Sequence, residues 1–234
     1  MLRFLVVLVL TLTPCFAENY GIYNPHNYNF HSEPDEKILF ILDFSNSMNE
    51  SVRGERKVDM MLNTMANLLP SLNKNIEIGL RVYGHKMGFT PIEACRASSL
   101  IVPIGSGNDV MSSLSKVKPR GMTPITYSLK QAVKYDFLGF KGKKHIILLT
   151  DGGENCDESP CKYVMELVKI RKDIFIDVIA FDISDGDDLN QLQCTALVTS
   201  GKFYTAKTSA ELLKSLNNSV SGKKEVEAKI ISNY

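Results

Sequence analysis

The chain has 234 residues, of which 44% are hydrophobic. That length suits one large domain, and it is long enough to bury a full sheet with helices on both faces. Lys and Arg together number 27 against 26 Asp and Glu, and no run of like charge stands out. This balance argues against nucleic acid or an anionic membrane as the main partner.

The N-terminus has the pattern of a secretory signal peptide. Arg3 supplies a positive charge, residues 4–12 form an apolar run, and Ala17 precedes a predicted cleavage point. Residues 1–17 are therefore predicted to be removed from a secreted or periplasmic protein. The apolar run is too short to span a bilayer, and no later segment reads as transmembrane. A buried first element and lipid attachment at Cys15 are the disfavoured alternatives, the second because a proline precedes the cysteine where a small residue is needed.

Regular patterning begins after an irregular segment, residues 18–36, that is rich in Asn, Tyr, His and Pro. Three continuous apolar runs are typical of strands buried on both faces, and alternating or short runs predict further strands. The predicted strands are residues 37–43, 76–83, 99–104, 145–150, 174–181 and 202–205. Apolar residues at helical spacing predict helices over residues 58–69, 109–117, 125–133, 164–171, 189–198 and 210–220.

This alternation of strands and helices predicts an α/β fold. We expect a doubly wound, mostly parallel central sheet with helices on both faces and right-handed connections. The domain would comprise residues 37–221, followed by a polar tail over residues 222–234. Because ligands of such sheets bind at the carboxyl ends of the strands, the residues that follow each strand are the candidates for function.

Oxygen-bearing side chains follow the first buried strand. Asp43, Ser45 and Ser47 occupy alternate positions, so their side chains can point the same way in an extended or turning loop. One carboxylate and two hydroxyls suit a small, hard cation such as Mg²⁺, which takes oxygen ligands and keeps several waters. Taken alone, the triplet could also be an ordinary loop of turn-forming residues.

Two further residues are predicted to reach the same edge of the sheet. Asp151 follows the strand over residues 145–150, and two glycines after it leave room for a sharp turn. Thr123 stands just before a helix. Each has an ordinary alternative, since Asp-Gly is a common turn and Thr123 before Pro124 is a good helix N-cap. The agreement of all three elements in order and position favours a metal site.

Together, Asp43-x-Ser45-x-Ser47, Thr123 and Asp151 resemble the metal-ion-dependent adhesion site of the von Willebrand factor type A family. The resemblance covers nearly the whole predicted domain and implies a Rossmann-like fold. It implies that Ser45, Ser47 and Thr123 bind the metal through their hydroxyls. Asp43 and Asp151 would contact the metal directly or through water. An Asp or Glu of a protein partner would fill the open position of an Mg²⁺, Mn²⁺ or Ca²⁺ ion.

Other segments extend this resemblance to a bacterial secreted branch of the family, namely residues 81–85 and residues 151–161. Asn46 departs from the pattern, because most members have a glycine between the two serines. Asn tolerates unusual backbone angles, so we expect little effect. In related domains, ligand binding shifts the last helix, here around residues 209–221, and we carry that over as a hypothesis only.

Four cysteines lie outside the predicted leader: Cys95, Cys156, Cys161 and Cys194. An even number in an exported protein favours two disulfides. A zinc site is disfavoured, since the spacing of Cys156 and Cys161 is wider than the usual half-site and no His lies near in sequence. Three pairings are possible. In the fold that the resemblance implies, Cys95–Cys156 with Cys161–Cys194 is favoured, and Cys156–Cys161 with Cys95–Cys194 is the close alternative.

The predicted function is therefore capture of a protein partner that presents Asp or Glu, without catalysis. A metal-dependent hydrolase of the phosphatase kind would want a second carboxylate two positions after Asp43, where Ser45 stands. No nucleophile–base pair can be assembled from these positions, and no G-x-S-x-G or H-E-x-x-H motif is present. A structural subunit whose metal only holds loops together is the remaining alternative. The acidic residues 182–188 lack EF-hand spacing and are interpreted as a solvated loop.

Overall fold

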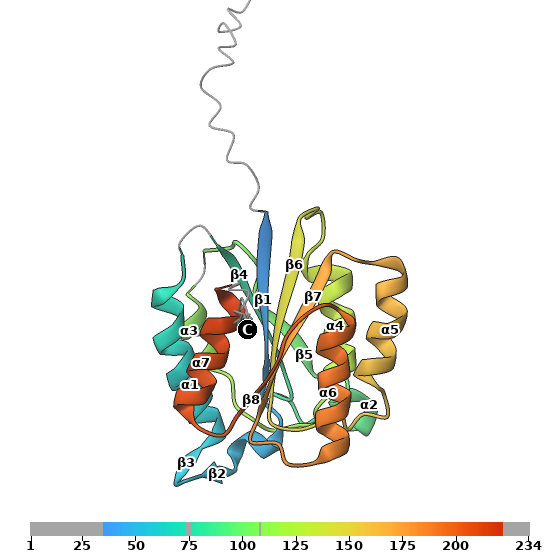
Figure 1. Ribbon diagram of the computed structural model, residues 1–234. Helices are drawn as coiled ribbons and strands as arrows, with labels where there is room; N and C mark the ends of the chain where they lie inside the picture. Colours follow the sequence, from blue (N-terminus) through green and yellow to red (C-terminus); the bar gives the residue numbers. More distant parts are fainter. Residues whose placement is uncertain (1–34, 74–75, 108, 222–234) are drawn as a thin grey trace, which may run out of the picture. The chain divides into compact units, whose positions relative to one another are not determined.

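A computed structural model describes residues 35–73, 76–107 and 109–221. A six-stranded sheet, in the order β5-β4-β1-β6-β7-β8, lies between two layers of helices (Figure 1). Neighbouring strands are parallel except for β4 and β5, which are antiparallel. The predicted doubly wound, mostly parallel α/β fold is confirmed. The predicted leader, nearly all of the irregular segment and the tail lie outside the described residues.

The bounds of the elements are as follows. The strands of the large sheet are β1 (Glu36–Asp43), β4 (Glu77–Tyr83), β5 (Ser98–Val102), β6 (Lys143–Thr150), β7 (Ile174–Phe181) and β8 (Phe203–Ala206). The helices are α1 (Lys57–Leu68), α2 (Pro91–Ala94), α3 (Val110–Leu114), α4 (Ile125–Gln131), α5 (Pro160–Ile170), α6 (Gly186–Val198) and α7 (Ser209–Val220). A 3-10 turn (Asn46–Asn49) leads into a small hairpin of β2 (Ser51–Val52) and β3 (Glu55–Arg56), and a π-helical turn (Ala132–Asp136) extends α4.

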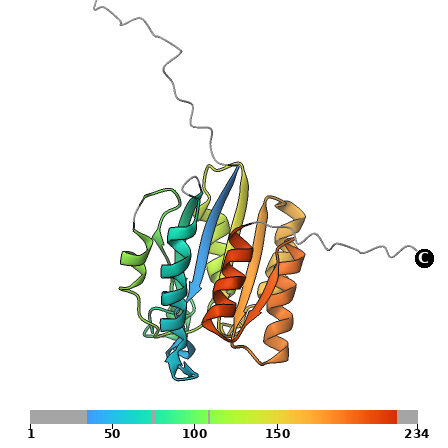
Figure 2. The same cartoon turned by 60° about the vertical axis from the view of Figure 1, so that its left-hand side comes forward.

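The central strands are mainly apolar because helices cover both of their faces. Alternate residues of β1 enter different cores, with Phe40 and Leu42 in one and Leu39 and Ile41 in the other. Helices α1, α3 and α7 pack on the first face, and α4, α5 and α6 on the second (Figures 1 and 2). Full burial of each such side chain contributes roughly 1.5–3 kcal/mol. The unbroken apolar runs of the sequence therefore mark the middle of the sheet.

Several helix boundaries differ from those predicted, because side-chain caps outweigh apolar spacing there. Helix α5 begins at Pro160, since the Ser159 hydroxyl accepts a hydrogen bond from the amide of Lys162. Helix α6 begins at Gly186, where the Asp185 carboxylate caps it. The predicted helix 109–117 is only the short α3. The hairpin β2–β3 and helix α2 were not predicted.

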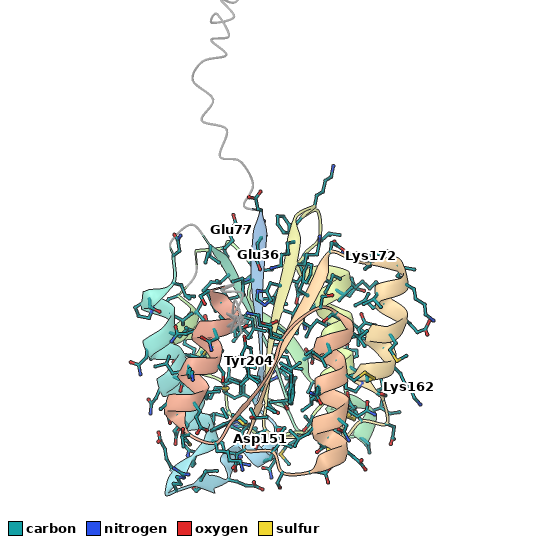
Figure 3. All side chains as sticks on the ribbon, in the orientation of Figure 1. Glu36, Glu77, Asp151, Lys162, Lys172 and Tyr204 are labelled. Atoms are coloured by element: carbon teal, nitrogen blue, oxygen red, sulfur yellow. A yellow bond between two sulfur atoms is a disulfide. The ribbon has the colours of Figure 1, made fainter. Side chains whose placement is uncertain are left out.

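A buried polar network lies at the amino ends of the strands. The His145 imidazole on β6 lies 3.0 Å from Glu36 Oε1 through Nδ1 and 3.3 Å from Asp177 Oδ2 through Nε2. Ser219 in α7 donates a hydrogen bond of 2.7 Å to the same Asp177 oxygen. Burial alone would lower the pKa of His145, but hydrogen bonds and charges from Asp177 and Glu36 outweigh it and raise the pKa. Figure 3 shows Glu36 at the edge of the sheet opposite Asp151.

None of the helices within the described ranges has the length and apolar character that a membrane crossing requires.

Candidate metal-binding site

Two of the predicted site residues end neighbouring strands. Asp43 is the last residue of β1, and Asp151 directly follows β6. These strands are parallel neighbours in which Leu42 pairs with Leu149, so both carboxylates reach the same edge of the sheet. Figure 3 labels Asp151 at this edge. The carboxyl ends of the strands thus bring together side chains that lie 108 residues apart in sequence.

Asp43 is fully buried and held in one orientation. Its Oδ1 accepts a hydrogen bond of 2.6 Å from the amide of Ser45. Its Oδ2 accepts hydrogen bonds from the Tyr83 hydroxyl at 2.9 Å and from the Thr150 hydroxyl at 2.8 Å. Burial and the charge of Asp43 raise the pKa of Tyr83 well above its usual value, so this phenol remains a donor. Both carboxylate oxygens of Asp43 are therefore engaged by neighbouring groups.

The two serines and Asp151 form a continuous hydrogen-bonded chain. The hydroxyls of Ser45 and Ser47 are 3.0 Å apart, and Ser47 donates a hydrogen bond of 2.7 Å to Asp151 Oδ1. The side chains of Ser45 and Ser47 thus point the same way, with Ser45 just before the 3-10 turn and Asn46 and Ser47 as its first two residues. Asn46 has no positive φ, so the glycine of most family members is not needed at this position.

A glycine beside this loop is needed for its close approach to β4. Gly84 follows β4 with φ +71°, and a Cβ there would lie 2.5 Å from the amide nitrogen of Ser45. Any side chain at this position would therefore push the serine-bearing loop away from the sheet edge.

Thr123 reaches the edge through backbone contacts. The segment that leads to Thr123 pairs with the loop that carries the two serines, through a bridge between Gly121 and Ser45. The Gly121 carbonyl accepts a hydrogen bond of 2.9 Å from the amide of Asn46. The amide of Thr123 donates to Asn155 Oδ1 at 2.7 Å, which links the segment to the loop after Asp151. The Thr123 hydroxyl is not part of the serine–aspartate chain in the described structure. The interpretation of Thr123 as a helix cap is wrong, because the residue that precedes α4 is Pro124.

Lys57 is a further charged group at the site that sequence reasoning missed. It begins α1, is buried, and places Nζ 3.1 Å from Asp151 Oδ2 and 3.0 Å from Glu50 Oε2. Burial lowers the pKa of Lys57, but the charge of Asp151 and the hydrogen bonds to Glu50 and Asp151 outweigh this effect and raise it. Only long-range packing creates the contact, since the two residues are 94 positions apart. No local pattern marks Lys57.

The buried carboxylates carry more negative charge than Lys57 offsets. Burial, and then the charge of Asp151, raise the pKa of Asp43. Burial also raises the pKa of Asp151, against the lowering effects of Ser47 and Lys57. A bound divalent cation would relieve this cost, and carboxylate and hydroxyl oxygens are the ligands that Mg²⁺, Mn²⁺ and Ca²⁺ accept. The donor set therefore fits such an ion.

Within the described ranges, no group of three or more His, Cys, Asp or Glu side chains is placed to hold a metal ion. The set above, with two carboxylates and additional hydroxyls, is of a different kind.

The four cysteines outside the predicted leader form two disulfides, as the favoured pairing predicted. Cys95 bonds to Cys156 and Cys161 to Cys194, with Cα–Cα distances of 5.5 Å and 5.4 Å. The zinc alternative and the local pairing are therefore wrong. Two disulfides indicate an extracytoplasmic protein, because such bonds persist in oxidising compartments.

Comparison with known proteins agrees with the fold. The sequence profile of the von Willebrand factor type A domain matches residues 37–219. The protein YwmC of Bacillus subtilis (strain 168) is 30% identical over 183 residues, which are 76% of this chain and 79% of YwmC. BatB of Bacteroides thetaiotaomicron has a similar structure, with a TM-score of 0.62 at 17% identity over 80% of this chain and 97% of BatB.

A second solved structure is proximal thread matrix protein 1 of the mussel byssus, described with a zinc-occupied MIDAS motif. Its TM-score is 0.61 at 20% identity, over 79% of this chain and 44% of the mussel protein. At this identity the likeness concerns the fold. The profile match, however, spans most of the sequence and includes every candidate ligand described above. The chain belongs to the von Willebrand factor type A domain family.

Proposed function

We propose that this domain holds a divalent cation at the carboxyl edge of its sheet and uses it to capture an acidic residue of a protein partner. The hydrogen-bonded chain of Ser45, Ser47 and Asp151, next to the buried carboxylate of Asp43, carries this proposal. The zinc-occupied motif of the mussel protein supports it by likeness of fold. Mg²⁺ is the first candidate, with Mn²⁺ and Ca²⁺ as alternatives.

In this proposal, the hydroxyls of Ser45, Ser47 and Thr123 and the carboxylates of Asp43 and Asp151 hold the ion. The ion, when bound, supplies a positive centre that accepts a carboxylate oxygen. With two carboxylates in the site and Lys57 already paired with Asp151, the ion retains charge for a partner's Asp or Glu. A partner carboxylate desolvated at such a centre gains a strong ionic interaction.

Binding is favoured over hydrolysis by the surroundings of Asp43. A nucleophilic carboxylate needs an accessible oxygen, whereas both oxygens of Asp43 are hydrogen-bonded and its side chain is buried. The position of a second catalytic carboxylate is occupied by Ser45, as the sequence indicated. These surroundings favour binding over a hydrolase that uses Asp43 as its nucleophile.

We also infer export through the N-terminal leader, so that the domain acts in the secreted or periplasmic space. The two disulfides support this compartment. The mass of the protein recovered from that compartment should correspond to a chain that begins after Ala17; an intact N-terminus would contradict cleavage there.

Calorimetric titration with Mg²⁺ and Mn²⁺ tests the metal site. The protein is expressed with its own N-terminal segment, and wild type is compared with Asp43→Asn and Asp151→Asn, which preserve side-chain shape. Asp187→Asn is the matched control, because Asp187 is an exposed carboxylate in the first turn of α6 that is not part of the proposed site. Saturable binding by wild type and the control, lost in both site variants while circular dichroism stays unchanged, is expected.

Two results would separate the alternatives. A well-folded wild type that binds neither metal would refute the proposed site. Metal binding without any metal-dependent binding of acidic peptides would instead support a purely structural ion.

A further inference from the structure

The segment between β4 and β5, residues 84–97, forms a rim beside the proposed site. Its first residue, Gly84, accepts hydrogen bonds at its carbonyl from the amides of Arg120 and Gly121, just before Thr123. A side chain at Gly121 would collide with the carbonyl of Lys86. At the other end, the Cys95–Cys156 disulfide joins the segment to the loop that follows Asp151. The segment is thus fixed against two loops that carry proposed metal ligands.

This segment exposes large apolar side chains. Met87 is 69% exposed, Phe89 fully exposed and Ile92 66% exposed, all within six residues. The backbone beneath them is held, since the amide of Phe89 donates to Glu93 Oε2 at 2.8 Å and the Thr90 hydroxyl caps α2. Apolar side chains gathered on a held backbone at an exposed surface are typical of an interaction site.

Basic side chains accompany the apolar ones. A pocket of about 430 Å³ is lined by Lys86, Phe89, Arg96 and Ser99 among others. A second pocket of about 370 Å³ shares Arg96 and is lined also by Ile92, Tyr127 and Glu158. We call Lys86, Met87, Phe89, Ile92 and Arg96 the β4–β5 rim.

Charge is distributed unequally on the two sides of the proposed site. Next to the rim, the segment that leads to Thr123 adds the exposed basic residues Lys116, Lys118 and Arg120, which line a further pocket with His85. On the other side, beyond Asp151, lie the acidic residues Glu50 and Asp182 at Lys57, and Asp185, Asp187 and Asp188 at the start of α6. The rim side also carries two acidic residues, Glu93 and Glu158, but its three pockets are lined by five basic ones: Lys86, Arg96, Lys116, Lys118 and Arg120. An acidic ligand is therefore attracted to the rim side and repelled from the α6 side.

We propose that the β4–β5 rim binds the partner segment that flanks the metal-coordinating carboxylate, and that this segment carries a large apolar residue and a second acidic residue. The apolar residue would contact Phe89 and Ile92, and the second carboxylate would pair with Lys86 or Arg96. The inference rests on the proposed function for the first carboxylate, but the rim itself is a separate surface. A protein segment is favoured over a lipid surface because the pockets are concave and Glu93 lines the larger one.

The probe is a phage-displayed peptide library with one fixed Asp and randomised flanks, selected on the wild-type protein in Mg²⁺. Selected peptides are then tested on Phe89→Ser/Ile92→Ser and on Lys86→Glu/Arg96→Glu. Matched controls are Leu138→Ser, an apolar side chain 84% exposed in the turn before β6, and Lys134→Glu, an exposed lysine just after α4. Calorimetry with Mg²⁺ is run on every variant.

We expect the selected flanks to be enriched in apolar and acidic residues. Each rim variant should weaken binding by roughly tenfold or more, as removal of central contacts does, while the controls bind like wild type. Affinity for Mg²⁺ should stay unchanged in the rim variants. In Lys86→Glu/Arg96→Glu, the rate of association with the peptide should also depend less on salt concentration.

Different failures have different meanings. Mg²⁺-dependent peptides without such enrichment, or peptides that bind the rim variants as well as wild type, overturn the rim inference and leave the proposed function intact. Selected peptides that bind equally in the presence of a chelator, or no selected peptide at all, overturn the proposed function and the inference with it. Sedimentation with phosphatidylglycerol vesicles that is abolished by Phe89→Ser/Ile92→Ser would overturn the assignment of a protein partner.

Discussion

Removal of the Cys95–Cys156 disulfide should destabilise the domain strongly. The bond joins residues 61 positions apart, and for a closed loop of that size the chain-entropy relation gives about 4.3 kcal/mol at 25 °C. The double variant Cys95→Ser/Cys156→Ser restores to the unfolded chain the conformational entropy that the bond removes. Because domains of this kind have a total stability of about 5–15 kcal/mol, the variant should fold but unfold at much lower denaturant.

The second disulfide provides the matched comparison. Cys161–Cys194 spans 33 positions, for which the same relation gives about 3.7 kcal/mol. Urea unfolding followed by circular dichroism measures both losses, provided that the slope with denaturant is similar to that of wild type. Only the Cys95–Cys156 variant should also weaken binding of peptides selected on the rim, since this bond holds residues 84–97 in place. A decrease in unfolding free energy of less than about 1 kcal/mol in the variant that lacks Cys95–Cys156 would refute the entropic reasoning.

Other predictions concern the metal, the far edge of the sheet and a buried ion pair. Mg²⁺ at a hundred times its dissociation constant should add about 2.7 kcal/mol of stability and roughly 5–10 °C of melting temperature, which a thermal scan with and without chelator measures. Because the pKa of His145 is raised, its contribution to stability is fully present below the usual pKa of 6.5 and is lost as the pH rises through the raised pKa. The difference in unfolding free energy between wild type and His145→Gln, measured by urea unfolding, should therefore shrink above pH 6.5. A difference that does not change with pH would contradict the ion pairs with Glu36 and Asp177. Asp136→Asn should cost about 3–5 kcal/mol of unfolding free energy, because it removes the charge that pairs with the buried Arg81 and one of the two oxygens that accept its hydrogen bonds, at 2.6 Å and 2.7 Å. A cost near zero in the same assay would contradict the burial of this pair.

The sheet could be predicted because its signals are local. The apolar runs of β1, β6 and β7, the last interrupted by Asp177, follow from helices on both faces, and the order of strands and helices leaves few topologies. The positions of Asp43 and Asp151 follow from the strand ends alone. The choice among the three possible cysteine pairings depended on the expected fold, which shows which cysteines lie close together.

The remaining features depend on contacts that no window of sequence contains. Lys57 enters the site because α1 packs beside a loop almost a hundred residues later. The hairpin β2–β3 has only two residues in each strand, too few to show a period. Helix α2 did leave a local signal, since Thr90-Pro91-Ile92-Glu93 has a capping residue, a proline at the first position and a Glu at the third.

The hydrogen bond between Ser219 and Asp177 has a mechanical consequence. Asp177 is held on its other oxygen by the amide of Lys202, so α7 is attached near its end to a rigid point of the sheet. Sliding α7 by one turn, about 5.4 Å, would separate this buried pair and remove the Ser219 donor from Asp177 Oδ2, which would keep only its contact with His145. The end of α7 is therefore coupled to β7 by a buried polar contact in addition to the apolar packing of Leu212 and Leu216. A ligand-driven shift of this last helix would first have to break that attachment.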